Sequence, residues 1–181
     1  MKIILATPLY PPDIAEPAPY VKELAKCLKS LHGVTIVTYG GIPEKVEGVN
    51  IVSVSKKQPL PIRLLLYTFV LWKATRGAEI IYAQNGPSTE LPVGVVSLIT
   101  GKPVIFHIID KTSHQRASKN RLLNSIENFV FKRAKKIITE TPLPRPEILP
   151  FNARPEEEIL KYEESWEKHI NELNKIFENE K

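Results

Sequence analysis

The chain has 181 residues, a net charge of +5, sixteen prolines and one cysteine. A chain of this length fits one domain that buries roughly 70% of its unfolded surface. The lone cysteine excludes a disulfide framework and a thiolate metal cluster, and the longest apolar run is far shorter than the roughly 20 residues that cross a membrane. We therefore expect a cytoplasmic protein without a signal peptide.

Charge is distributed unevenly along the chain. Residues 155–181 hold nine Glu and four Lys, a net charge of −5, so the rest of the chain carries +10. A basic body attracts nucleotide diphosphates, anionic lipid headgroups or nucleic acid. The aromatic residues are not interleaved with the basic ones as a nucleic-acid platform requires, so we expect no specific nucleic-acid partner. A peripheral position at a membrane surface remains open.

The first forty residues predict a strand, a stiff loop, a helix and a second strand. The apolar run 3–6 suits a buried parallel strand. Five prolines between residues 7 and 19 prevent a strand or a helix interior there, which predicts a loop. Apolar residues recur at helical spacing from Tyr20 to Leu31, and residues 34–39 are typical of a strand.

Strands and helices continue to alternate after these forty residues. We predict strands at 48–55, 78–84, 102–110 and 135–140, a largely buried helix at 61–77, and further helices at 88–101 and 118–136. Alternation of this kind indicates a doubly wound parallel α/β sheet of about six strands, which binds ligands at the carboxyl ends of its strands.

The last forty residues follow another pattern. Residues 141–155 hold five prolines and predict an extended crossing segment. Residues 156–179 carry an apolar stripe along one helix of roughly 36 Å. We expect this helix to close the body, and a partner-binding or self-associating helix is the alternative. The predicted organisation is a domain at 1–141, a crossing segment at 142–155 and a packed helix at 156–181.

Several common chemistries lack their motifs in this chain. No G-x-G-x-x-G follows the first strand, and G-x-x-x-x-G-K-[ST], H-E-x-x-H and G-x-S-x-G do not occur. The four histidines, at 32, 107, 114 and 169, have no metal-ligand spacing. We therefore expect neither a metal nor a resident cofactor.

Three segments resemble the family 4 retaining glycosyltransferases of the GT-B fold. MKIILATPLYPPDIAEPAPYVKELAKCLKSLHGVTIVTYG resembles their start, AEIIYAQNGPSTELPVGVVSLITGKPVIFHIID their middle segment, and RAKKIITE the last strand of their N-terminal Rossmann-like domain. The resemblance implies that this domain binds the acceptor and that a C-terminal domain binds a nucleotide sugar as co-substrate.

The family's C-terminal domain, with its glutamate pair, has no counterpart in this sequence. SWEKHINELNKIFENE resembles the family's final helix, which crosses back onto the N-terminal domain. The resemblance thus implies an acceptor-side domain, inactive alone, whose donor-binding half is supplied elsewhere. Its acceptor would be phosphate-bearing or lipid-linked.

The resemblance also implies positions for the site. Ala15 and Glu16, after Pro12, stand where the family usually has paired glycines, so this loop suits an acceptor better than a diphosphate. His107 and Asp110 end the fifth predicted strand, where a family member contacts the transferred sugar. The remaining acceptor or phosphate candidates follow the fourth and fifth strands: Tyr82, Gln84, Asn85, Ser88, Lys111, His114 and Arg116.

Each candidate has a structural alternative, such as a core histidine, a plain turn or a solvated loop. The leading functional hypothesis is a glycosyltransferase-like acceptor-side domain that transfers a sugar only with a separate donor-binding half. The alternative is a non-catalytic binding or assembly module, and a third hypothesis is a homodimer formed through the long helix.

Overall fold

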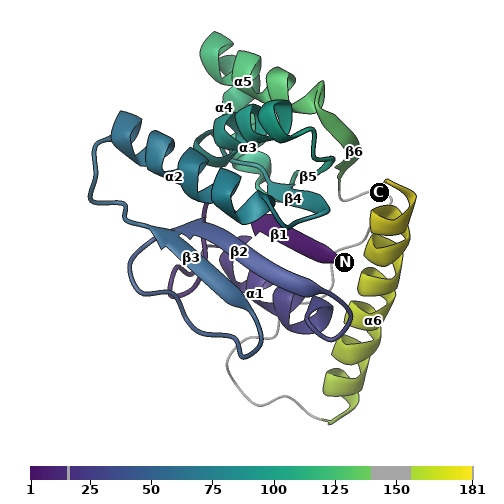
Figure 1. Cartoon of the computed structure of the whole chain (residues 1–181). Coiled ribbons are helices and arrows are strands. Elements are labelled where there is room, and N and C mark those ends of the chain that lie inside the picture. The colour runs from purple at the N-terminus through teal and green to yellow at the C-terminus, as the bar shows by residue number, and fades with distance from the viewer. Residues whose placement is uncertain (16, 140–155, 181) are drawn as a thin grey trace.

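Six parallel strands form the sheet (Figure 1). The computed structural model describes residues 1–15, 17–139 and 156–180, so the expected crossing segment 142–155 lies outside the described residues. The strand order is β3-β2-β1-β4-β5-β6, which confirms the predicted doubly wound α/β sheet. The strands are β1 (Lys2–Ala6), β2 (Gly33–Tyr39), β3 (Asn50–Val54), β4 (Ile80–Gln84), β5 (Val104–His107) and β6 (Ala134–Ile138).

Helices cover both faces of the sheet. The helices are α1 (Pro17–Leu28), α2 (Leu60–Thr75), α3 (Pro87–Thr100), α4 (Lys111–Lys119), α5 (Arg121–Phe131) and α6 (Glu156–Asn179). One apolar core joins α1 and α6 to the sheet, and a second core joins α2, α3 and α5 to the opposite face. Helix α3 lies between α2 and α5 (Figure 1). Among the described helices, none is long and apolar enough to span a membrane.

The alternation of side chains along each strand separates the two cores. In β1, Ile3 and Leu5 belong to the core under α1 and α6, whereas Ile4 and Ala6 belong to the core under α2 and α3. This is the period of two that a pleated strand imposes. Because both faces are covered, the central strands are apolar on both sides, as the continuous run of β1 predicts.

Helix α6 closes the face that α1 leaves open. Trp166, Ile170, Leu173 and Phe177 are buried in the same core as the apolar side of α1. The expected packing of this helix on the body is therefore confirmed.

Three predicted elements differ from the structure. Helix α1 already begins at Pro17, because proline fits the first turn of a helix, where the N–H has no partner. The predicted helix 118–136 is interrupted at Asn120, between the end of α4 and the start of α5, since Asn120 is extended and its side chain accepts from the N–H groups of Leu122 and Leu123. The last residues of that predicted helix instead form the start of the edge strand β6, which begins at Ala134 and whose Lys135 and Lys136 are exposed.

The prediction that helix 61–77 is largely buried is wrong. Only Tyr67, Leu71 and Thr75 of α2 are buried, and its outer side is exposed. The sequence pattern is apolar all round, but the sheet covers only one side of the helix. Strand β5 is also shorter than predicted, because it ends at His107 and Asp110 begins the turn into α4.

Candidate functional site

A pocket of about 370 Å³ lies beside the loops after β1 and β4, where the order of the strands in the sheet reverses. The chain adds β2 and β3 on one side of β1 and β4 to β6 on the other, so the loops after β1 and β4 diverge. Such a switch point is the usual ligand site of an open α/β sheet. The lining residues are Pro8, Leu9, Pro17, Tyr39, Lys56, Arg63, Asn85, Gly86, Pro87, Ser88, Asp110 and Ser113.

Asn85 joins the loop after β4 to the loop after β5. Its Oδ1 accepts from the N–H groups of Ile109 and Asp110, both at 2.9 Å, and its Nδ2 donates to the Asp110 carbonyl at 2.7 Å. The side chain is almost fully buried although it lines the pocket. Asn85 therefore fixes the pocket wall, and its hydrogen-bonding groups are largely used within the protein.

Asp110 combines a structural contact with a position at the pocket. Its carboxylate accepts from the N–H of Ser113 at 3.0 Å and caps α4, as an aspartate at this position commonly does. The residue is only partly buried and lines the pocket. A carboxylate so placed can accept a hydrogen bond from a ligand hydroxyl.

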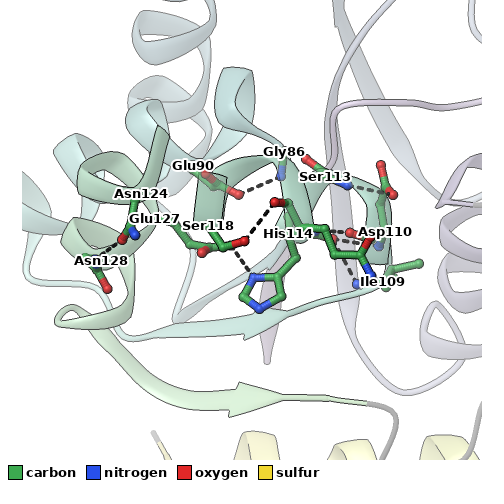
Figure 2. A network of polar contacts seen from close by, with 12 residues as sticks. Gly86, Glu90, Ile109, Asp110, Ser113, His114, Ser118, Asn124, Glu127 and Asn128 are labelled. Carbon is green, nitrogen blue, oxygen red and sulfur yellow. Dashed lines mark hydrogen bonds and ion pairs between the residues drawn. The ribbon is translucent and has the colours of Figure 1, made fainter. Parts of the chain in front are cut away.

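Gly86 allows the loops after β1 and β4 to approach each other. Its φ is +149°, and a Cβ there would lie 3.1 Å from Cγ of Pro8, so only glycine fits without strain. Its N–H donates to Oε1 of Glu90 at 2.9 Å (Figure 2). The pKa of the Glu90 carboxyl is raised to about 7, mainly by burial and to a smaller extent by the nearby Glu127, whereas the hydrogen bond from Gly86 opposes the shift.

Two cations and a phenol face the pocket from the other side. Lys56, just after β3, is held by Asp13 at 2.7 Å, and the Arg63 guanidinium lies 5.6 Å from the ring centre of Tyr39. The Tyr39 hydroxyl donates to the carbonyl of Ser88 at 2.7 Å, so it also supports the start of α3. Sequence reasoning missed all three residues. The signal for Lys56 was its place at the carboxyl end of a predicted strand.

The structure brings only some of the predicted site residues to this pocket. Asn85, Ser88 and Asp110 line it, and Pro12 lines an adjoining pocket of about 250 Å³ that shares Tyr39 and Lys56 with it. Ala15 is exposed outside the linings of both pockets. Glu16 lies outside the described residues, as does the side chain of Lys111.

His107 and Tyr82 do not line the pocket. Their side chains lie in the core under α1 and α6. The Tyr82 hydroxyl meets Nδ1 of His107 and lies 3.1 Å from the Tyr20 hydroxyl, which in turn lies 2.7 Å from Nε2 of His169. The pKa of His107 is lowered to about 3, mainly by burial and to a smaller extent by the nearby His169. We call Tyr20, Tyr82, His107 and His169 the buried polar chain.

Gln84 is also buried, and it accepts from the Thr7 hydroxyl at 2.6 Å. His114 turns toward α5, where its Nδ1 lies 2.7 Å from Oε1 of Glu127 (Figure 2). Arg116 is exposed on α4. None of these three residues lines the pocket, so the structure separates them from Asn85, Ser88 and Asp110.

The pocket thus offers two cations, one carboxylate and apolar walls. Within residues 1–15, 17–139 and 156–180, no group of three His, Cys, Asp or Glu side chains is placed to hold a metal ion. The lining suits a ligand that has a negative group beside hydroxyls. The cations would hold the negative group, and the carboxylate would accept from a hydroxyl.

Comparison with solved structures finds the same fold in Anabaena HepE. The complex of HepE with UDP has 18% identity and a TM-score of 0.50, and the complex with UDP and glucose has 16% and 0.51. Each alignment covers 76% of this chain and 37% of the HepE chain. The chain thus spans 37% of the length of HepE, and at this identity the likeness shows the fold alone.

Comparisons of the sequence itself give two results. No curated protein matches the chain significantly. The model of the glycosyl transferase 4-like domain matches residues 16–160, which is most of the chain. The protein therefore belongs to the glycosyl transferase 4-like domain family.

Proposed function

We propose that this chain is the acceptor-side half of a sugar transferase. The observation that carries the proposal is the pocket at the switch point, where Lys56, Arg63 and Asp110 line one cavity in a chain of this family. The chain spans 37% of HepE, which supports a donor-binding half on another chain or segment. A nucleotide sugar is then the co-substrate, bound largely by that other half.

In this proposal the pocket residues have distinct roles. Lys56 and Arg63 hold a phosphate of the acceptor, because a lysine and an arginine at one cavity favour a compact anion. Asp110 orients the hydroxyl that receives the sugar. Asn85 keeps Asp110 in place through its bonds to the backbone of residues 109 and 110. We assign no direct substrate contact to His107, since its imidazole is buried against Tyr82.

The experiment is a calorimetric titration of the full chain with a short-chain lysophosphatidic acid below its micelle concentration, because this lipid carries a free hydroxyl beside its phosphate. We expect Arg63→Gln to weaken binding about tenfold, the loss of one charge-assisted contact. Arg116→Gln is the matched control, because Arg116 is exposed outside the pocket. Asp110→Asn tests the carboxylate, since asparagine can still cap α4. Equal binding by the Arg63 and Arg116 variants would contradict the pocket assignment.

Catalysis is tested separately from binding. The isolated chain should not hydrolyse UDP-glucose or transfer glucose from it, because the proposal assigns donor binding to another chain or segment. Robust turnover by the isolated chain would overturn the requirement for a second half. A non-catalytic binding module is the competing function, and the internal use of Asn85 and the capping role of Asp110 favour it. Acceptor binding that Asp110→Asn leaves unchanged would support that module.

A further inference from the structure

Helix α2 is apolar on its outer side as well as its inner side. Tyr67, Leu71 and Thr75 face the sheet and are buried. Ile62, Leu65, Leu66 and Phe69 recur every three or four residues on the outside, where Leu65 is 71% and Phe69 57% exposed. A helix that is apolar all round is normally covered on every side. The outer stripe of α2 therefore lacks a cover within the described part of the chain.

The neighbouring helix exposes two further large apolar side chains. Leu98 is 51% and Ile99 64% exposed near the carboxyl end of α3. Helices α2 and α3 pack side by side (Figure 1), and both run opposite to the parallel strands, so their carboxyl ends meet at one edge of the fold. Scattered exposed leucines are ordinary, but a group of large apolar side chains over two adjacent helices indicates an interaction surface.

The exposed charges on α2 and α3 all have one sign. Helix α2 has no acidic residue, and the one acid of α3, Glu90, is buried. Lys73 and Arg76 continue the exposed stripe beyond Phe69, and Arg76 lies 4.1 Å from the ring centre of Trp72. We use the name α2–α3 surface for the following exposed residues: Ile62, Leu65, Leu66, Phe69, Lys73, Arg76, Leu98 and Ile99.

Charge is also distributed unequally between the two faces of the sheet. Residues 55–139, which contain α2 to α5, hold fourteen Lys or Arg and four Asp or Glu, and Glu90 and Glu127 are buried among those four. Helix α6 on the opposite face holds eight Glu and three Lys. An anionic plane would therefore attract the face of α2 and α3 and repel the face of α6.

We propose that the α2–α3 surface docks on an anionic lipid bilayer. The leucine, isoleucine and phenylalanine side chains enter the headgroup layer, and Lys73 and Arg76 lie at the level of the phosphates. A second copy of the chain fits less well, because a symmetric contact would bring these like charges together. The proposal goes beyond sugar transfer and does not depend on it.

The test is co-sedimentation of the full chain with phosphatidylcholine vesicles, with and without phosphatidylglycerol. We expect binding only to the anionic vesicles and weaker binding at high salt. The double variant Leu65→Gln with Phe69→Gln should bind at least about tenfold more weakly. Its matched control is Leu31→Gln with Leu160→Gln, two exposed leucines outside the surface.

Charge variants separate electrostatic attraction from insertion. Lys73→Gln with Arg76→Gln should weaken binding about twenty-five-fold, since each cation near an anionic membrane contributes about fivefold. Lys161→Gln with Lys168→Gln, on α6, is the control and should bind normally. Trp72 reports insertion, because brominated lipid should quench it while Trp166, buried on the opposite face, stays bright. The variant Trp72→Phe should remove the quenched signal.

Several outcomes would overturn the proposal. The first is failure of the parent chain to bind anionic vesicles at low salt, and the second is equal binding by the surface variants and their controls. A third is a dimer, measured by light scattering, that the Leu65 and Phe69 double variant dissociates, which would assign the surface to a second copy. Circular dichroism of each variant shows that altered binding does not reflect unfolding. Vesicle binding by a chain whose Arg63→Gln and Arg116→Gln variants bind the short-chain lipid equally well would leave this proposal standing and count only against the proposed function.

Discussion

Helices α2 and α6 lie on opposite faces of one sheet and use their apolar side chains in opposite ways. Helix α6 is the more polar of the two, yet its Trp166, Leu173 and Phe177 are buried against α1 and the sheet. Helix α2 is the more apolar, yet Leu65 and Phe69 are exposed. Burial thus follows from the presence of a covering element and not from the apolar content of a helix.

The largest expected effect comes from truncating one phenylalanine on each face. Phe177→Ala should lower the free energy of unfolding by about 3–5 kcal/mol, because it leaves a cavity beside Tyr82 and His32. Phe69→Ala should change it by no more than about 0.5 kcal/mol, since that ring is exposed. Urea denaturation measures both. Similar losses of unfolding free energy in the two variants would contradict the conclusion that α6 is covered and the outer side of α2 is not.

The second-largest expected effect is on the pH dependence of the free energy of unfolding. Glu90, on the face of α2 and α3, and His107, on the face of α1 and α6, should change it with opposite signs. Glu90 has a pKa of about 7 in the folded protein, above its ordinary value, so the folded state binds the proton more tightly. The free energy of unfolding therefore falls as pH rises from about 4.5 to about 7. His107 has a pKa of about 3, below its ordinary value, so its contribution rises with pH between about 3 and about 6.5.

Glu90→Gln isolates the first of these contributions. Glutamine can still accept from the Gly86 N–H but does not titrate, so the variant should lack a decline of about 2–3 kcal/mol between pH 4.5 and 7. Unfolding by urea at several pH values measures the difference from the parent chain. Glu178→Gln, exposed on α6, should follow the parent. An unchanged slope in the Glu90 variant would show that this carboxyl is already ionised in the folded state.

The smallest effect concerns the buried polar chain. Tyr20→Phe removes the hydroxyl between Tyr82 and His169 and should cost about 1–2 kcal/mol of unfolding free energy. Tyr10→Phe is the matched control, because the buried Tyr10 hydroxyl has no hydrogen-bond partner among the described residues. Its loss should change stability by less than about 0.5 kcal/mol. Equal changes in unfolding free energy for the Tyr20 and Tyr10 variants would show that the buried polar chain adds nothing to the docking of α6.

The sequence predicted the order and type of most elements, because strands in a parallel sheet and the helices between them have clear apolar periods. It did not predict that α2 would be exposed, since the same period describes a helix covered on one side or on two. The break at Asn120 was missed because one asparagine interrupts an otherwise continuous helical pattern.

Prediction of the candidate site was less complete for a geometric reason. Asn85, Ser88 and Asp110 immediately follow central strands, and the carboxyl ends of those strands meet at the pocket. His107 is only three residues before Asp110, but it still belongs to β5 and faces the core under α1 and α6. Arg63 lies on α2, far along the chain from these residues, and only the folded arrangement brings it to the pocket.

The exposed lysines of β6 bear on how the protein behaves when crowded or refolding. Strand β6 ends the sheet, so no described strand pairs with its outer edge. An open edge offers backbone donors and acceptors to a strand of another molecule, which is the first step of amyloid-like growth. Lys135 and Lys136 would bring like charges together in any such edge-to-edge pairing of two copies. The charge repulsion between these lysines should therefore disfavour aggregation through strand β6.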